Sequence, residues 1–170
     1  MTAPKEIRNL ITDPRFTGGQ WTANGAFVTP VTEQYALNVT NSNSNDAFAR
    51  LILPDVTAYR GVNMTLACSL SWIPSNATEC GNGLMFVAAN TILGNMSDGG
   101  TARTGRKVLS FTIPVDTISM EVRLYGPAVD NSTFQWWRPM LTRTEDYQLM
   151  LHGTGLPAPM DYFDYGTNPE

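Results

Sequence analysis

The most constraining feature of this sequence is a strict alternation of apolar side chains with polar or small ones between Val62 and Ile73. Six apolar residues occupy every second position there: Val62, Met64, Leu66, Cys68, Leu70 and Trp72. Successive side chains of a β-strand point to opposite faces, so this pattern predicts a strand with one face in a protein core. We therefore expect Cys68 and Trp72 to be buried.

The same two-residue period recurs along most of the chain. Further strands are predicted at residues 35–40, 47–53, 84–93, 109–113 and 118–125. Stretches rich in Gly, Asn, Asp and Ser separate them, and these residues favour turns. Many short strands at this spacing predict an all-β sandwich or barrel of about eight to ten strands. Helical periodicity is weak everywhere, and we expect at most one helical turn, at residues 147–151.

Composition and charge divide the 170 residues into two parts. Residues 1–143 are expected to form one β-sandwich domain, which is an ordinary size for a single core. Residues 144–170 carry five acids and no Lys or Arg. They also hold the aromatic residues Tyr162, Phe163 and Tyr165, which purely disordered tails seldom have. We expect residues 144–170 to form an extended arm that docks on a partner.

Several classes of function are disfavoured. The sequence lacks a basic stripe of the kind that binds nucleic acid. It also has no apolar run that approaches the length of a membrane span. The start of the chain lacks the apolar stretch of a secretory signal. Arg103, Arg106 and Lys107 form the one basic cluster, for which we expect a solvated loop or, as the alternative, a surface for an acidic partner. The two cysteines, Cys68 and Cys80, are expected to be free rather than bridged.

No catalytic constellation is apparent, so we expect no enzyme. His152 is the only histidine, and a Ser-His-Asp or Cys-His site would have to use it. One His and two Cys do not readily make a zinc site. No phosphate loop, nucleophile elbow or dinucleotide fingerprint occurs. We expect no catalytic residues, no metal and no cofactor.

An ordered series of motifs resembles the jelly-roll domains related to carbohydrate-binding modules. These motifs are NLITDPRF at residues 9–16, WTANGAF at 21–27, YALNVT at 35–40, TGRKVLSFTIP at 104–114, MEVRLYGP at 120–127 and FQWWRPMLTR at 134–143. The resemblance covers about residues 8–143 and implies one antiparallel jelly roll. Family members often bind a structural calcium ion through acids near the first motif and in the last strand. Thr17 and either Trp137 or Arg138 replace such acids here, so we expect no calcium.

Within that family, RPMLTR followed by YFDYGTNP at residues 162–169 looks most like virion proteins of phages that infect actinobacteria. This resemblance implies a minor tail or capsid decoration protein, located in the virion and made in the host cytoplasm. Its partners would be other virion proteins, including copies of itself in a homo-oligomer. The alternative is a carbohydrate-binding module that attaches the particle to a glycan on the host cell surface.

Seven aromatic residues are candidates for docking a partner or a glycan: Trp21, Tyr59, Tyr125, Trp137, Tyr162, Phe163 and Tyr165. Packing in the core is the competing interpretation for each, and it is favoured for Trp21. Alternation from Phe134 predicts that Trp136 points into the core and Trp137 points outward. Pro139 favours a bulge or an edge position in that strand. We expect Trp137 to contact the chain's own tail or a neighbour.

Overall fold

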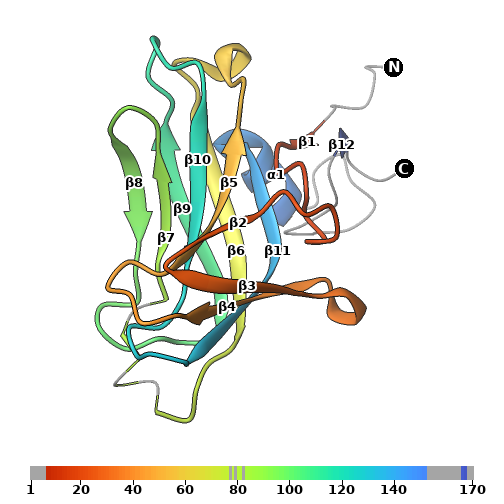
Figure 1. The fold of residues 1–170 in the computed structure, drawn as a ribbon. Coiled ribbons are helices and arrows are strands. Elements are labelled where there is room, and N and C mark those ends of the chain that lie inside the picture. Colours follow the sequence, from red (N-terminus) through yellow and green to blue (C-terminus); the bar gives the residue numbers. More distant parts are fainter. Residues whose placement is uncertain (1–6, 77, 79, 82, 153–165, 168–170) are drawn as a thin grey trace.

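The protein is a sandwich of two antiparallel five-stranded sheets, seen in a computed structural model (Figure 1). The structure describes residues 7–76, 78, 80–81, 83–152 and 166–167. The first sheet has the strand order β2-β5-β10-β7-β8 and the second β3-β4-β11-β6-β9. The predicted all-β class and the jelly-roll sandwich are thus confirmed.

The first sheet faces the viewer in Figure 1. Its strands are β2 (Thr22–Asn24), β5 (Phe48–Leu53), β7 (Met85–Ala88), β8 (Ile92–Met96) and β10 (Met120–Tyr125). β10 lies at the centre, between β5 and β7. Because β5 and β10 lie far apart in the sequence, their pairing brings distant side chains onto one surface.

The strands of the second sheet are β3 (Ala26–Val31), β4 (Ala36–Asn41), β6 (Asn63–Trp72), β9 (Gly105–Thr112) and β11 (Thr133–Arg143). Strands β6, β9 and β11 lie behind the first sheet in Figure 1, and β3 and β4 cross at the lower front. Pro30 lies in β3, which is an edge strand where a missing backbone N–H is tolerated. Short 3-10 helices, η1 (Thr32–Gln34) and η2 (Thr57–Tyr59), occupy two of the connections.

Gly25 forms the corner at which the chain passes from the first sheet to the second. It separates β2 from β3 and has a φ of 55°, in the left-handed region. A Cβ atom at this position would lie 2.3 Å from Oγ of Ser44. Glycine is therefore required for two reasons: it adopts this positive φ without strain, and it has no Cβ atom to clash with Ser44.

The core fills the space between the two sheets. Its largest fully buried members come from both sheets and include Leu37, Leu51, Met64, Leu66, Leu70, Met85, Phe134 and Trp136. Cys68 and Trp136 are buried as predicted, and both cysteines are free. Trp136 also joins the sheets, since its Nε1 donates a 2.8 Å hydrogen bond to the carbonyl of Tyr125.

Trp72 contradicts its prediction, because its side chain is 49% exposed. It is the last residue of β6, and the register against β11 shifts between Gln135 and Trp136. The shift leaves Ser71 without an opposite residue in β11, so the alternation of β6 is interrupted after Leu70 and Trp72 lies opposite Gln135 rather than in the core.

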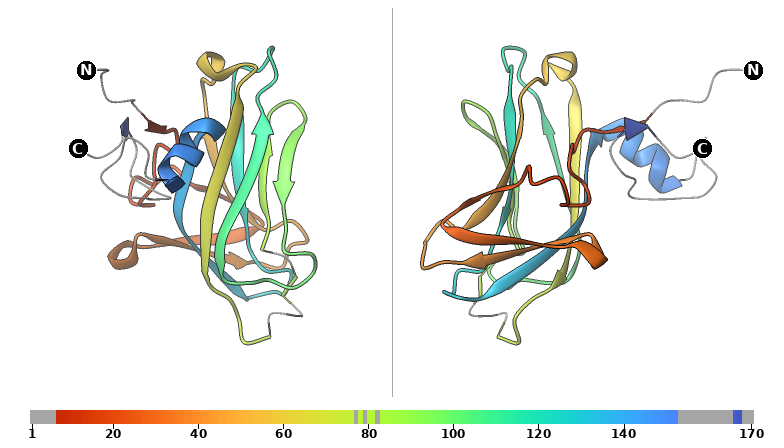
Figure 2. Two further views of the ribbon diagram at one scale, coloured as in Figure 1. Left: turned by 180° about the vertical axis from the view of Figure 1, so that it is seen from behind. Right: turned by 45° about the vertical axis from the view of Figure 1, so that its right-hand side comes forward.

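A helix replaces the single turn predicted near residue 147. α1 spans Thr144–His152, begins directly after β11, and packs on β6 and β11 at the back of the second sheet (Figure 2). Its buried residues are Asp146, Tyr147 and Met150. Glu145 and Asp146 lie in its first turn, where the helix dipole favours negative charge. Nine residues are too few for a clear helical period in the sequence.

Two short segments near the ends of the chain pair in a separate, two-stranded sheet. β1 (Arg8–Asn9) pairs antiparallel with β12 (Gly166–Thr167). The predicted docking aromatics Tyr162, Phe163 and Tyr165 lie outside the described residues.

Candidate ligand-binding faces

The outer surface of the first sheet carries a compact group of aromatic and charged side chains, which we call the arginine face. It consists of the outward members of three neighbouring strands: Phe48, Arg50, Phe86, Glu121, Arg123 and Tyr125. Their inward neighbours in β10, Met120, Val122 and Leu124, fill the core. The two-residue period of β10 therefore builds the core and the arginine face at the same time.

Arg123 is the centre of the arginine face. Its guanidinium carbon lies 4.6 Å from the ring centroid of Phe48 and 5.1 Å from that of Phe86. Its Nε donates a 2.7 Å hydrogen bond to Oε1 of Glu121. Cation–π contact with two rings and a fixed carboxylate hold the planar guanidinium in one orientation.

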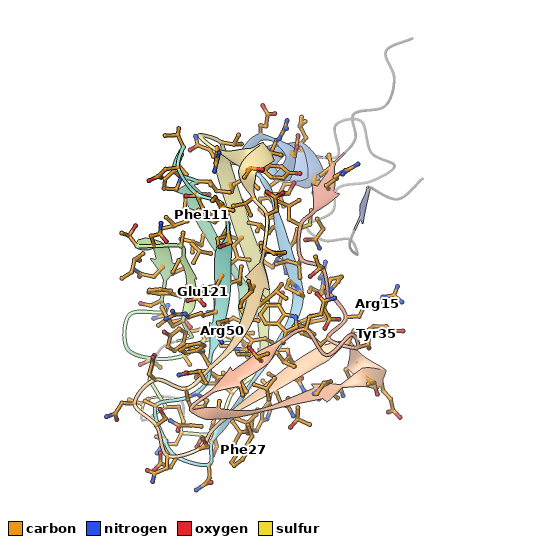
Figure 3. The ribbon with its side chains drawn as sticks, turned by 45° about the horizontal axis from the view of Figure 1, so that its top comes forward. Arg15, Phe27, Tyr35, Arg50, Phe111 and Glu121 are labelled. Atoms are coloured by element: carbon orange, nitrogen blue, oxygen red, sulfur yellow. The ribbon has the colours of Figure 1, made fainter. Side chains whose placement is uncertain are left out.

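Glu121 links two guanidinium groups across neighbouring strands. Besides Arg123, it forms an ion pair with Nη1 of Arg50 at 3.7 Å. Figure 3 shows Arg50 and Glu121 side by side over β5 and β10. Such partly exposed pairs add little to stability. Their effect is to present an ordered row of N–H donors and carboxylate acceptors to a ligand.

Tyr125 closes one end of this row. Its ring centroid lies 5.1 Å from that of Phe48, and its hydroxyl hydrogen-bonds with Arg123 and Asp46. Burial raises the pKa of the Tyr125 phenol. A phenol is protonated at neutral pH even without this shift, so the hydroxyl can donate. Towards the opposite end of β10, a shallow pocket of about 180 Å³ continues the surface past Ile52, Ala88 and Glu121.

The outer surface of the second sheet has a different chemistry. A pocket of about 250 Å³ lies there, lined by Gln34, Ala36, Ser71, Gln135 and Trp137, which we call the tryptophan face. Trp137 is half-buried and points outward, as predicted. The predicted bulge is confirmed: the register of β11 shifts between Trp137 and Met140, and Arg138 has a φ of 53°. The alternative, an edge strand, is wrong, because β11 lies at the centre of its sheet.

The other predicted site residues lie elsewhere. Trp21 is buried, packs on Phe16 at 5.4 Å, and donates from Nε1 to the carbonyl of Asp13, so it is a packing residue. Tyr59 borders a pocket of about 260 Å³ together with Arg8, Thr142, Arg143 and Asp146. The structure thus places Tyr125, Tyr59 and Trp137 at three separate sites.

The basic cluster is not the solvated loop that we predicted. Lys107 is buried and forms an ion pair with the buried Asp98. Arg106 donates to the carbonyl of Arg138 and to Oγ of Ser69, 3.3 Å away. Of the three residues only Arg103 has an exposed side chain. Two of the three cations therefore support local structure.

The remaining functional predictions concern metals, catalysis and membranes. Within the described part of the chain, no three His, Cys, Asp or Glu side chains are grouped to hold a metal ion. His152 lies exposed at the end of α1. No helix in the described ranges is long and apolar enough to cross a bilayer.

Arg50, Phe48, Phe86, Glu121 and Arg123 were missed at the sequence level. The signal was present in β10, where the residues opposite the core positions are Glu, Arg and Tyr rather than Ser or Thr. The pairing of β10 with β5 and β7 gathers the rest, and that pairing is not readable from local patterns.

Comparisons with known proteins place the fold. The C-terminal family 22 carbohydrate-binding module of Clostridium thermocellum Xyn10B superposes with a TM-score of 0.55 and 18% identity, covering 81% of this chain and 92% of that module. A xylan-binding domain of family 22 gives 0.54 and 18%, over 84% and 96%. The second N-terminal cellulose-binding domain of Cellulomonas fimi β-1,4-glucanase C gives 0.53 and 16%, over 82% and 95%.

At these identities the similarity is one of fold. The chain has the jelly-roll fold of carbohydrate-binding modules, as the sequence resemblance implied. No family model matches the chain, and no curated protein matches it in sequence.

Proposed function

We propose that this protein is a non-catalytic carbohydrate-binding module whose arginine face holds a glycan chain. The observation that carries the proposal is the fixed guanidinium of Arg123, held between Phe48 and Phe86 and tied to Glu121 and Tyr125. Preorganised donors and acceptors suit the vicinal hydroxyls of a sugar, since little side-chain freedom is lost on binding. The partly exposed ring of Tyr125 adds apolar contact for a pyranose face.

The binding role is favoured over a catalytic one by the make-up of this face. Glycoside hydrolysis generally uses two carboxyl groups that flank the scissile bond. Glu121 is the one carboxylate among the six side chains of the arginine face, and it is tied to two arginines. The structurally similar domains named above are also binding modules, for xylan in one case and cellulose in another.

The test is titration calorimetry of the intact chain with xylohexaose and cellohexaose. We expect saturable binding that Arg123→Ala weakens, because this variant loses the binding of the arginine face. Arg123→Lys is the matched control, because it keeps the charge but loses the planar fork, and it should bind at an intermediate level. Wild-type protein that binds no oligosaccharide on a glycan array would contradict the proposal, as would full affinity in a correctly folded Arg123→Ala variant.

Placement in a virion, docking on virion proteins and formation of a homo-oligomer stay predictions from the sequence resemblance. A glycan-binding module could serve such a particle in host attachment, so the two interpretations do not exclude each other.

A further inference from the structure

The tryptophan face lies on the opposite side of the sandwich from the arginine face and takes no part in it (Figures 1 and 2). α1 packs on β6 and β11 and buries Met140 and Ala67, outward members of those strands beyond the bulge. The pocket beside Trp137 lies on the other side of the bulge, where β4, β6 and β11 are neighbours.

Hydrogen bonds to the backbone and one cation–π contact fix the position of Trp137. Its carbonyl accepts a hydrogen bond from Sγ of the buried Cys68 at 3.2 Å. The next carbonyl, that of Arg138 at the bulge, accepts from Arg106. The guanidinium carbon of Arg138 lies 5.2 Å from the ring centroid of Trp137 and covers one face of the indole. The indole is therefore a fixed plate whose second face can receive a flat, ring-shaped ligand.

The polar groups beside Trp137 form an ordered network. Nε2 of Gln135 donates to Oδ1 of Asn38 at 3.1 Å, and Oε1 of Gln135 accepts from Oγ of Ser71 at 2.9 Å. A glutamine amide has two N–H donors and two acceptor lone pairs. These bonds use one donor and one acceptor and fix the orientation of the amide. The second donor and the second acceptor remain for a ligand with paired hydroxyls.

The lining residues of the pocket are Gln34, Ala36, Ser71, Gln135 and Trp137, none of which is ionised, and the Arg138 guanidinium lies against the Trp137 ring without lining the pocket. The arginine face, in contrast, contains two arginines and a glutamate. A neutral lining with an aromatic plate and amide groups matches a neutral polyhydroxyl ring better than an anion. The geometry points to a second glycan site, in which Trp137 stacks on one neutral pyranose and Gln135 holds its hydroxyls.

A protein partner or the chain's own tail is the competing occupant. A stable protein interface buries roughly 1,000 Å² or more, with an apolar centre. The groups beside Trp137 are instead hydroxyls and amides, among them Asn38, Ser71 and Gln135, with separate exposed rings at Trp72, opposite Gln135, and at Phe27. Contact with a hydrated sugar chain requires less apolar area than such an interface does.

Two sites on opposite faces would let one protein contact two glycan chains, or two segments of one polysaccharide. Binding at both sites then raises the apparent affinity through the effective concentration of the second site. This second site shares its ligand class with the arginine face but has no side chain in common with it. Glycan binding can therefore be absent at one site and present at the other, and the two proposals can be tested separately.

The test follows the tryptophan indole N–H signals of ¹⁵N-labelled full-length protein by NMR. The probes are four neutral oligosaccharides: xylohexaose, cellohexaose, mannohexaose and maltohexaose. We expect the Trp137 signal to shift saturably with at least one of them. The Trp21 and Trp136 signals should stay in place, because both indoles are buried and hydrogen-bonded within the protein. The backbone amides of Arg123 and Tyr125 report the arginine face separately in the same spectra.

Variants decide whether the pocket itself binds. Gln135→Ala should raise the dissociation constant obtained from the Trp137 titration about tenfold, because one or two hydrogen bonds to the sugar are lost. Trp137→Ala should abolish the shift of the Gln135 side-chain amide. Phe27→Ala is the matched control, because it removes an aromatic residue that is 62% exposed on the same sheet face but outside the pocket, and it should bind normally.

Three results would overturn the inference. The first is the absence of a saturable Trp137 shift with all four probes at millimolar concentration. The second is an unchanged response in Gln135→Ala. The third is a Trp137 signal that moves with protein concentration alone, which would assign this face to self-association.

Discussion

The two outer faces of the sandwich are built from the same strand geometry but carry opposite chemistry. The arginine face has guanidinium and carboxylate groups over two phenylalanines, whereas the tryptophan face has amides and hydroxyls around one indole. The first depends on regular strands, with residue opposite residue in β5, β10 and β7. The second depends on an irregularity, the bulge in β11. Regular pairing of strands can thus bring several charged side chains together on one face, whereas a bulge can expose one aromatic ring.

Removing the link between the faces should have the largest effect. Trp136→Ala deletes a fully buried side chain and the hydrogen bond to the Tyr125 carbonyl. We expect the free energy of unfolding to fall by about 3–5 kcal/mol, as for other large aromatic truncations. Urea denaturation followed by circular dichroism measures it. Trp137→Ala is the control, and an equal loss there would contradict the assignment of Trp136 to the core and Trp137 to the surface.

Asn9 supports the tryptophan face from the N-terminal segment. Its side chain donates to the Pro139 carbonyl at 3.1 Å and accepts from the backbone N–H of Leu141 at 3.0 Å, both at the bulge. Oδ1 also accepts from the backbone N–H of Ile11 at 3.1 Å. Asn9→Ala leaves three buried backbone groups without these partners, and we expect a loss of about 2–3 kcal/mol in the free energy of unfolding.

Asn9→Asp provides the matched comparison, because it keeps the acceptor and removes the donor. A buried carboxylate facing the Pro139 carbonyl is costly, so its loss, measured by urea denaturation, should be at least as large as that of Asn9→Ala. Hydrogen exchange at the Leu141 amide should become faster in Asn9→Ala. Unchanged protection at Leu141 would show that Asn9 does not stabilise the bulge.

A substitution of Glu121 should affect binding at the arginine face and leave the tryptophan face unchanged. Glu121→Gln keeps the shape of the side chain but removes the charge that pairs with Arg50 and Arg123. We expect a loss of about tenfold or more in oligosaccharide affinity at the arginine face, since hydrogen bonds to charged groups are worth about 1.5–3 kcal/mol. The Trp137 indole shift should be unchanged. A matched drop at both faces would mean that they are coupled.

Cys68 should give the smallest effect of the four, present at neutral pH and shrinking in alkali. Burial raises the pKa of its thiol from 9.0 to about 12. The thiol therefore ionises more readily in the unfolded chain. Its stabilising contribution is present below pH 9.0 and is lost as the pH rises towards about 12.

The measurement is the free energy of unfolding against pH for wild type and Cys68→Ala. The difference between the two should shrink above pH 9.0. A constant difference across this range would contradict a buried, protonated thiol. The Cys68→Ala variant should also loosen Trp137, whose carbonyl the thiol holds.

The sequence predicted those parts of the fold that depend on local alternation. Leu66, Val122 and Trp136 follow the two-residue period and lie in the core. Trp72 follows the same period in the sequence, but the register shift between β6 and β11 takes it out of the core, and such a shift depends on the partner strand rather than on the local pattern. α1 escaped notice because its burial comes from packing on β6 and β11 rather than from a long apolar stripe.

The candidate sites were predicted less completely than the fold. Trp137 and Tyr125 were named because aromatic residues are visible individually in a sequence. The sandwiching of Arg123 between Phe48 and Phe86 was not, since it requires three strands that are separated in the chain to become neighbours. Sites made by non-local pairing can be found only once the strand order is known.

The bulge at Arg138 has a consequence for how this surface can change over time. Trp136 and Leu141 both point into the core, yet they are five positions apart, so one residue between them lies outside the alternation. Arg138 therefore does not take part in the alternation of inward and outward side chains that the remaining residues of β11 follow. Substitutions there can reshape the plate that Trp137 offers without disturbing the interior. The φ of 53° at Arg138 favours Gly and Asn among the replacements.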